Sequence, residues 1–244
     1  QPKPLPRKGG YKEKKTGSAF FNAMAQKLGP LMFFMSRGRK GDKACLGAAN
    51  SLDVLGLNYA SSRYDEDVKK YPDRLMVGSE TMVADLPYNW ERVQKYPQLL
   101  GDFVWSAWDY LGEAGIGKIS YGQNPGMSFY AEYPCKAAYC GDMNLLGDRR
   151  PVSYWREIIW GLRKAPYLAV QPPEHHGEQH YMSSWSMTNA VHSWNWSGYE
   201  GRPVTVEVYT DAEEAALYVN GVLQEKKEAG KEKKARVLFE TVYT

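Results

Sequence analysis

The sequence has few cysteines, no long hydrophobic run and no close group of metal ligands. Three cysteines are too few for a scaffold built on disulfides, although Cys135 and Cys140 lie close enough in sequence to form one bridge. The longest apolar run, Pro30 to Met35, is much too short to cross a bilayer. The adjacent His175 and His176 have no carboxylate or cysteine partner at the spacing of a metal site. We therefore predict no membrane partner, no metal and no cofactor.

Positive charge is concentrated at one end of the chain. Residues 1–42 contain ten Lys and Arg but only two Asp and Glu, so the rest of the chain is net negative although the whole carries +3. A basic arm can bind nucleic acid. Residues 1–17, however, are rich in Pro, Gly and Lys and have no apolar periodicity. We interpret 1–17 as a basic flexible segment and expect no nucleic-acid partner, which leaves a nucleic-acid binder as the weakest functional hypothesis.

Apolar and amphipathic segments alternate between residues 18 and 165. Three apolar segments that end in polar residues are expected to be strands: Leu52–Tyr59, Arg74–Glu80 and Asp102–Asp109. Segments with helical periodicity lie around and between them, at residues 19–28, 43–51, 65–71, 89–100 and 153–164. This alternation predicts a parallel sheet with helical crossovers. Because each strand becomes polar where it ends, the pattern favours part of a (β/α)8 TIM barrel, whose chemistry lies at the C-terminal ends of its strands.

The composition changes near Ala165-Pro166, and residues 166–244 have a different pattern. Short alternating strands with turn signals are expected at residues 205–209, 216–220 and 236–243. Asn220-Gly221 favours a tight turn, and we interpret the Lys- and Glu-rich run 225–234 as a solvated hairpin tip. The expected fold class is therefore α/β plus all-β, with an immunoglobulin-like β-sandwich in the second part.

Glu80 is the strongest catalytic candidate. It ends an apolar strand after Gly78-Ser79, and a carboxylate facing a cavity at a strand end can attack an anomeric carbon. The alternative is that Glu80 only caps the next segment. Tyr59, beside Asn58, ends the preceding strand, where a phenol would orient the carboxylate and keep it ionised. The alternative for Tyr59 is simple packing.

Trp105, Trp108 and Asp109 lie towards the end of the third apolar segment. Indole rings stack on the apolar face of a sugar and a carboxylate binds its hydroxyl groups, so these residues suit a carbohydrate. Residues three apart point to opposite sides of a strand. Trp105 and Trp108 therefore cannot both face one site unless the strand bulges or ends between them, and we favour Trp105.

These strand ends together resemble glycoside hydrolase family 2, the family of β-galactosidases, β-glucuronidases and β-mannosidases. The matching segments are Leu57–Ala60, Tyr64–Asp67, Val77–Thr81 and Gly101–Asp109. The resemblance implies barrel strands six, seven and eight, with the family's nucleophile at Glu80, its orienting tyrosine at Tyr59 and its sugar-stacking tryptophan at Trp105. Asn58, Trp108 and Asp109 are expected to contact substrate.

The second part of the chain adds to this resemblance. It looks like the accessory β-domain that follows the barrel in many bacterial β-galactosidase-like members, on the segments His192–Trp196, Pro203–Thr210 and Leu217–Gly221. In the first part of the chain, Gly112–Gly117 resembles the pattern of the same subgroup.

Two motifs of the family are missing. Its general acid/base is a Glu that follows an Asn, but the chain contains no Asn-Glu dipeptide and begins with Gln rather than Met. We therefore expect a C-terminal fragment that is inactive alone and whose partner is the missing N-terminal part of its own chain. The chain also lacks the Asn-x-Lys triplet with which glucuronidase members bind the sugar carboxylate, so the resemblance favours a neutral sugar.

The leading hypothesis is retaining, double-displacement hydrolysis of terminal β-galactosides, or related neutral β-glycosides, in bacterial carbohydrate metabolism. The alternative is a non-catalytic carbohydrate-binding or assembly module. The sequence leaves the periplasm, the extracellular space and the cytoplasm all open as the compartment.

Overall fold

The computed structural model of the protein describes residues 39–122 and 131–244. The expected basic segment 1–17 and helix 19–28 lie outside these residues. The described elements, in chain order, are α2 (Arg39–Ala49), β1 (Val54–Asn58), η1 (Ser61–Arg63), α3 (Tyr64–Lys70), β2 (Leu75–Thr81), η2 (Val83–Asp85), α4 (Leu86–Lys95), β3 (Leu99–Val104), β4 (Ser120–Tyr121), α5 (Pro151–Ile159), β5 (Tyr167–Val170), η3 (Pro173–His175), β6 (His180–Tyr181), β7 (Pro203–Tyr209), β8 (Glu214–Val219), β9 (Val222–Glu228), η4 (Lys231–Lys233) and β10 (Arg236–Val242).

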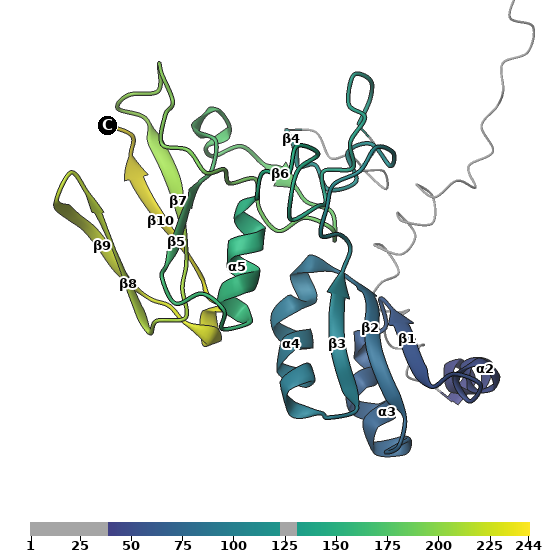
Figure 1. Ribbon diagram of the computed structural model, residues 1–244. Coiled ribbons are helices and arrows are strands. Elements are labelled where there is room, and N and C mark those ends of the chain that lie inside the picture. Colours follow the sequence, from purple (N-terminus) through teal and green to yellow (C-terminus); the bar gives the residue numbers. More distant parts are fainter. Residues whose placement is uncertain (1–38, 123–130) are drawn as a thin grey trace, which may run out of the picture.

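The first sheet is parallel, with the strand order β1-β2-β3 (Figure 1). The helices α3 and α4 connect consecutive strands, which confirms the predicted crossovers. Alternate strand residues, including Leu55, Leu57 and Met76, form a core with Tyr64 of α3 and with partly buried side chains of α4. Within the described residues the sheet has three strands and no closed barrel.

The other face of this parallel sheet is largely exposed. Val54, Leu75, Leu100 and Phe103 are 39–64% exposed although all four are large and apolar. Strand β3 is also shorter than the sequence pattern indicates, since it ends at Val104. Beyond it the chain leaves β2, and the backbone of residues 106–109 hydrogen-bonds instead to residues 142–143.

The second main sheet is antiparallel, with the order β10-β7-β5, and a separate hairpin pairs β8 with β9. Val204, Val206 and Val208 of β7 face the hairpin and form one core with Leu217 and Phe239. The opposite face of β7 packs towards α5. A second core forms there, made by residues including Trp155, Ile158, Tyr167 and Tyr209.

The hairpin between β8 and β9 tests two expectations. Asn220 and Gly221 form its turn, and both have positive φ angles (50° and 79°), as a two-residue hairpin turn of this kind requires. The predicted tight turn is therefore confirmed. The interpretation of 225–234 as a hairpin tip is wrong for its first part, because Glu225–Glu228 belong to β9 and pair with β8. Alternating Lys and Glu suit an exposed strand as well as a loop.

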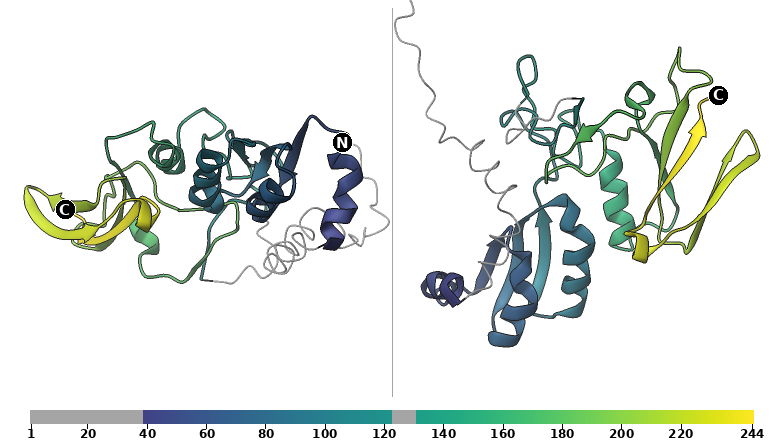
Figure 2. Two further views of the ribbon diagram at one scale, coloured as in Figure 1. Left: turned by 90° about the horizontal axis from the view of Figure 1, so that it is seen from below. Right: turned by 180° about the vertical axis from the view of Figure 1, so that it is seen from behind.

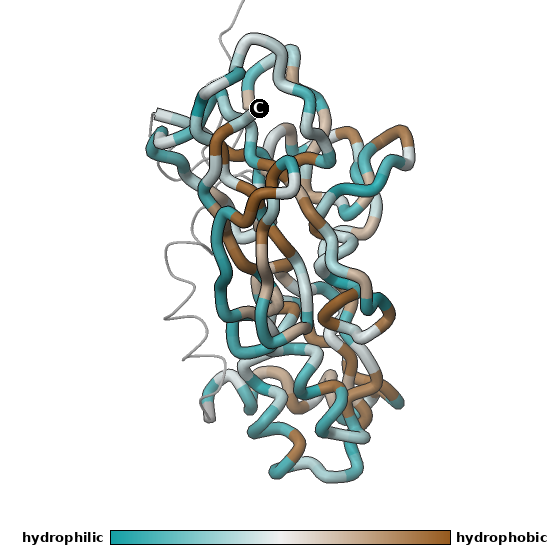
Figure 3. Tube along the Cα trace, turned by 90° about the vertical axis from the view of Figure 1, so that its left-hand side faces the viewer, coloured by the Kyte–Doolittle hydropathy of each residue, from teal (hydrophilic) through white to brown (hydrophobic). Residues whose placement is uncertain are grey.

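The parallel sheet with its helices and the antiparallel β-region lie at opposite ends of the molecule in both views of Figure 2. Helix α5 lies between them, against β5 and α4. Figure 3 shows that hydrophobic residues are concentrated along the inner strands, while much of the outer chain is hydrophilic.

Candidate functional site

Asn58 and Glu80 meet at the C-terminal edge of the parallel sheet. The register of β1 and β2 shifts there, since Gly56 pairs with Val77 whereas Asn58 pairs with Glu80. A bulge of this kind re-aims the side chain that follows it. Asn58 Nδ2 donates a hydrogen bond to Glu80 Oε2 (3.0 Å), and Ser79 Oγ donates to Asn58 Oδ1 (2.6 Å). The amide of Asn58 is thus oriented with its donor towards the carboxylate.

Gly78 permits the close packing behind Glu80. A Cβ atom at this position would lie 2.3 Å from the Tyr64 hydroxyl oxygen and 2.6 Å from Asp102 Oδ1. A larger residue would therefore require Tyr64 or Asp102 to shift. The glycine in the Gly-Ser-Glu sequence allows these two side chains to pack directly against β2.

Tyr59 adopts an unusual backbone conformation next to Glu80. Its φ angle is 50°, a region that bulky residues seldom occupy, and its backbone N–H donates to the Glu80 carbonyl oxygen (2.6 Å). Burial raises the pKa of the Tyr59 hydroxyl above its ordinary value, and the charge and hydrogen bond of Glu80 raise it further. The phenol is therefore protonated at neutral pH and can donate to a carboxylate.

Trp105 follows β3 and is half-buried. Its Nε1 donates to the Tyr110 hydroxyl oxygen (3.1 Å), the two rings meet at 75°, and the Tyr110 hydroxyl donates in turn to Glu113. Trp108 is 53% exposed, and its ring lies over Gly147. Because β3 ends before both residues, the geometric conflict expected for two indoles on one strand does not arise.

Asp109 is buried in contacts with its own chain. Its Oδ2 accepts from Arg150 Nη2 (2.7 Å), and its Oδ1 accepts from the backbone N–H groups of Tyr139 (2.8 Å) and Tyr110 (3.2 Å). A carboxylate with both oxygens occupied in this way has little capacity left for sugar hydroxyl groups. The geometry favours a role for Asp109 in holding the loop 139–150 against the segment after β3.

Trp185 is the main residue of this region that the sequence pattern did not single out. It is 5% exposed, and its Nε1 donates to the Tyr59 hydroxyl oxygen (3.1 Å). It lies 126 residues from Tyr59, in a segment without strand or helix periodicity. No local signal in the sequence marks it.

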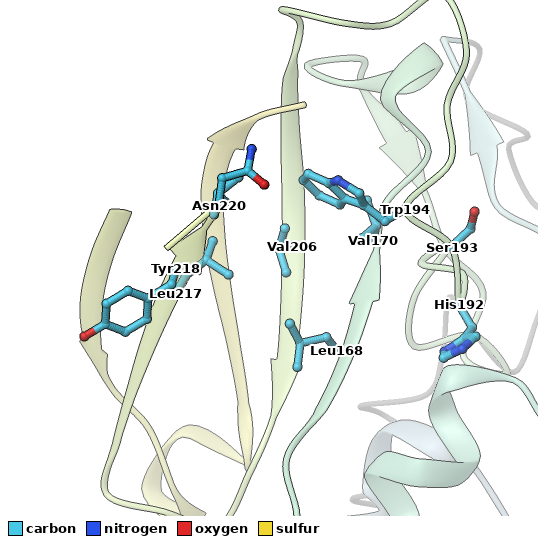
Figure 4. Close-up of a pocket in the computed structure, with 10 residues that line it drawn as sticks. Leu168, Val170, His192, Ser193, Trp194, Val206, Leu217, Tyr218 and Asn220 are labelled. Carbon is cyan, nitrogen blue, oxygen red and sulfur yellow. The ribbon is translucent and has the colours of Figure 1, made fainter. Parts of the chain in front are cut away.

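A separate cavity of about 460 Å³ lies at the open side of the β-region, between β5 and β8 (Figure 4). Its floor is aliphatic, with Leu168, Val206 and Leu217, and Trp194 and Asn220 lie at its upper end. None of the predicted catalytic residues contributes to it. Its lining carries no group suited to glycosidic bond cleavage.

Residues 39–122 and 131–244 contain no group of three or more His, Cys, Asp or Glu that would hold a metal ion. No helix within those ranges is long and apolar enough to span a bilayer. Cys45, Cys135 and Cys140 are free thiols, so the bridge that the sequence spacing allowed does not form.

Comparison with family models and curated proteins gives one match. Residues 201–244 match a domain of unknown function (DUF4982). No curated protein matches the chain.

Solved structures match much more of the chain. A glycosyl hydrolase family 2 member from Bacteroides cellulosilyticus is 31% identical with a TM-score of 0.70, over 95% of this chain and 31% of that one. A family 2 member from Bacteroides cellulosilyticus DSM 14838 is 33% identical with a TM-score of 0.59, over 79% of this chain and 22% of that one. The chain thus spans less than a third of the length of either relative.

Proposed function

Because the chain belongs to glycoside hydrolase family 2, we propose that it carries the nucleophile part of a retaining glycosidase site, with Glu80 as the nucleophile. The observation that carries the proposal is the hydrogen bond from Asn58 to Glu80 at the C-terminal edge of a parallel sheet. This edge is where α/β barrels perform their chemistry. We accordingly propose that β1, β2 and β3 are the last strands of a (β/α)8 barrel, and that residues 166–244 form an immunoglobulin-like domain.

The proposed reaction is double displacement. The Glu80 carboxylate attacks the anomeric carbon, the glycosidic C–O bond breaks, and a protonated carboxyl group gives its proton to the leaving oxygen. The same group then removes a proton from water, which attacks the glycosyl ester and releases Glu80 and the sugar. Asn58 and Tyr59 would hold Glu80 in the orientation needed for attack and stabilise its negative charge.

The general acid/base is proposed to come from a part of the protein outside this chain. A retaining site needs a second carboxyl group about 5–5.5 Å from the nucleophile. The chain contains no Asn-Glu dipeptide and spans less than a third of its solved relatives. The exposed apolar face of the parallel sheet is consistent with further strands packing there. We therefore expect this chain alone to be inactive.

The proposed substrate is a terminal β-galactoside or a related neutral β-glycoside. Trp105 would stack on the sugar, with the exposed Trp108 at the edge of the site. Asp109 is better suited to supporting the loop 139–150 than to binding sugar, because Arg150 and two backbone N–H groups occupy its oxygens. The absence of an Asn-x-Lys triplet argues against a uronic acid.

The test is Glu80→Gln in the full-length protein, assayed with nitrophenyl β-galactoside, β-glucoside and β-glucuronide. Loss of the nucleophile is expected to lower kcat on the order of 10³-fold or more. Glu91→Gln on α4 is the matched control, since Glu91 is exposed and pairs only with its neighbour Arg92 in the described structure; it is expected to keep full activity.

A mechanism-based 2-deoxy-2-fluoro-β-galactoside gives an independent readout. We expect it to form a covalent ester on the peptide that contains Glu80, detected by mass spectrometry, and none in Glu80→Gln. Wild-type turnover by Glu80→Gln would show that the nucleophile assignment is wrong. Binding of galactosides without turnover by the full-length protein would instead favour the non-catalytic carbohydrate-binding module.

A further inference from the structure

The indole of Trp185 reaches the proposed nucleophile through the Tyr59 hydroxyl group. Trp185 Nε1 lies 3.1 Å from the Tyr59 hydroxyl oxygen, and the two rings meet edge to face at 83°. An indole N–H is a donor only, so in this bond the phenol oxygen must be the acceptor. The Tyr59 proton is thereby left free to point away from Trp185. Glu80 is the neighbour of Tyr59 across the strand ends, since the Tyr59 backbone N–H donates to the Glu80 carbonyl oxygen (2.6 Å).

The segment that carries Trp185 is fixed independently of Tyr59. Ser183 Oγ donates to the Ile116 carbonyl oxygen, and Ser186 Oγ donates to that of Gly117. The indole itself packs in a buried cluster with Ile116, Ala138 and Cys140. Trp185 is therefore a rigid donor, held by the loop that follows β3 and not by the strand that carries Tyr59.

Tyr59 needs such a support because its own strand does not determine its orientation. Its φ of 50° places it beyond the regular end of β1, and its side chain is 39% exposed. Without a second contact the phenol ring is free to rotate away from Glu80. A donor on a fixed segment restricts the hydroxyl group to one position and one proton direction.

We propose that Trp185 is a positioning residue for the nucleophile, acting through a hydrogen-bond chain from the Trp185 indole to the Tyr59 hydroxyl and from there to the Glu80 carboxylate. This inference rests on the proposed function. It assigns a role in the glycosidase site to the segment 181–190, which lies within the second predicted domain, residues 166–244. The contact also connects segment 181–190 to Tyr59 at the end of β1.

The test compares Trp185→Phe, Tyr59→Phe and the double variant in the full-length protein, with nitrophenyl β-galactoside as substrate. Trp185→Phe is expected to lower kcat about five- to tenfold with less than a twofold change in KM, as for one lost hydrogen bond that acts on the reacting group.

The double variant separates positioning from general structural damage. If Trp185 acts through Tyr59, the double variant should match Tyr59→Phe in both kcat and KM. Additive losses in the double variant, or a loss that falls on KM instead of kcat, would overturn the inference. Trp196→Phe is the matched control: in the part of the chain that the structure describes, its indole N–H has no hydrogen-bond partner, so neither kcat nor KM should change.

A second variant covers the case in which Trp185→Phe does not fold. Replacing Trp185 by 3-benzothienylalanine keeps the size of the ring system and removes only the N–H donor, so the same kinetic changes are expected. If Glu80→Gln is inactive while the benzothienyl variant behaves as the wild type, only the role of Trp185 is wrong. If Glu80→Gln is active, the proposed function itself fails.

Discussion

The two main sheets of this chain differ in how many of their faces are covered. The antiparallel sheet β10-β7-β5 has α5 and the segment 171–190 on one face and the β8-β9 hairpin on the other, so β7 is buried on both sides from Val204 to Tyr209. The parallel sheet β1-β2-β3 has helices on one face only, and Phe103 on the other is 64% exposed.

The two regions also differ in how they stabilise a carboxylate that is removed from water. Burial alone would raise the pKa of Glu207 in β7, but hydrogen bonds and charge from Arg236, with hydrogen bonds from Thr188 and Gln171, hold it below its ordinary value. In the parallel sheet, burial raises the pKa of Asp102 to about 6 despite hydrogen bonds from Thr81 and Asn89. The antiparallel region thus supplies a cation bonded to Glu207, whereas in the described structure the partly buried Asp102 of the parallel sheet has no directly bonded cation.

The largest effect is expected from removing that cation. Arg236 donates two hydrogen bonds to Glu207 (2.8 and 2.9 Å), and Arg236→Met leaves a buried carboxylate without a counter-charge. We expect the free energy of unfolding to fall by about 3–5 kcal/mol, measured by urea denaturation at pH 7. Lys226→Met, which breaks the exposed pair with Glu214, is the control and should change it by less than about 0.5 kcal/mol. Equal losses in the two variants would contradict the contrast between the sheets.

A smaller effect is expected at Asp102 and depends on pH. Its folded pKa of about 6 lies above the ordinary 3.8, so between these values the folded state binds more protons and stability falls as the pH rises. Asp102→Asn removes this dependence and should be more stable than the wild type by about 1–2 kcal/mol above pH 6, with no such gain at pH 4. Glu207 changes in the opposite direction: its lowered pKa gives stability that is lost only as the pH falls below about 4.5.

The experiment is a series of urea titrations of both proteins from pH 4 to 7.5. Asp73→Asn, at an exposed turn residue, serves as the control and should parallel the wild type throughout. A constant difference between Asp102→Asn and the wild type across this range would refute the assignment.

The smallest effect is expected on the open face of the parallel sheet. Phe103→Ser should change the stability of this chain by less than about 1 kcal/mol, because the ring is already mostly in water. Phe239→Ser, in the core of the β-region, should destabilise by at least about 3 kcal/mol. If Phe103 faces further strands in the full-length protein, Phe103→Ser should become markedly more destabilising there, as followed by thermal unfolding; no change between the two contexts would count against barrel closure on this face.

Local patterns in the sequence determined the order and type of most elements. The alternation of apolar and amphipathic segments predicted β1, β2 and the crossover helices, and Asn220-Gly221 predicted the β8-β9 turn. The sequence also predicted Tyr59 and Glu80 at the ends of neighbouring strands, because parallel strands that start in register end at the same edge. The hydrogen bond from Asn58 to Glu80 was not predicted. The end of β3 was predicted five residues too late, because residues 106–109 hydrogen-bond to the distant residues 142–143 and not to β2.

Only the tertiary structure decided how the side chains around Glu80 are supported. It placed Arg150 against Asp109 and Trp185 against Tyr59, and it buried Glu207 where an alternating strand pattern would allow a solvent-exposed carboxylate. These contacts join residues 29 to 126 positions apart. Periodicity and turn chemistry depend on neighbours within a few residues, so they cannot specify which distant loop returns to a strand end. The sequence by itself thus predicted Glu80 as the carboxylate of the site, and the tertiary structure decided which side chains surround it.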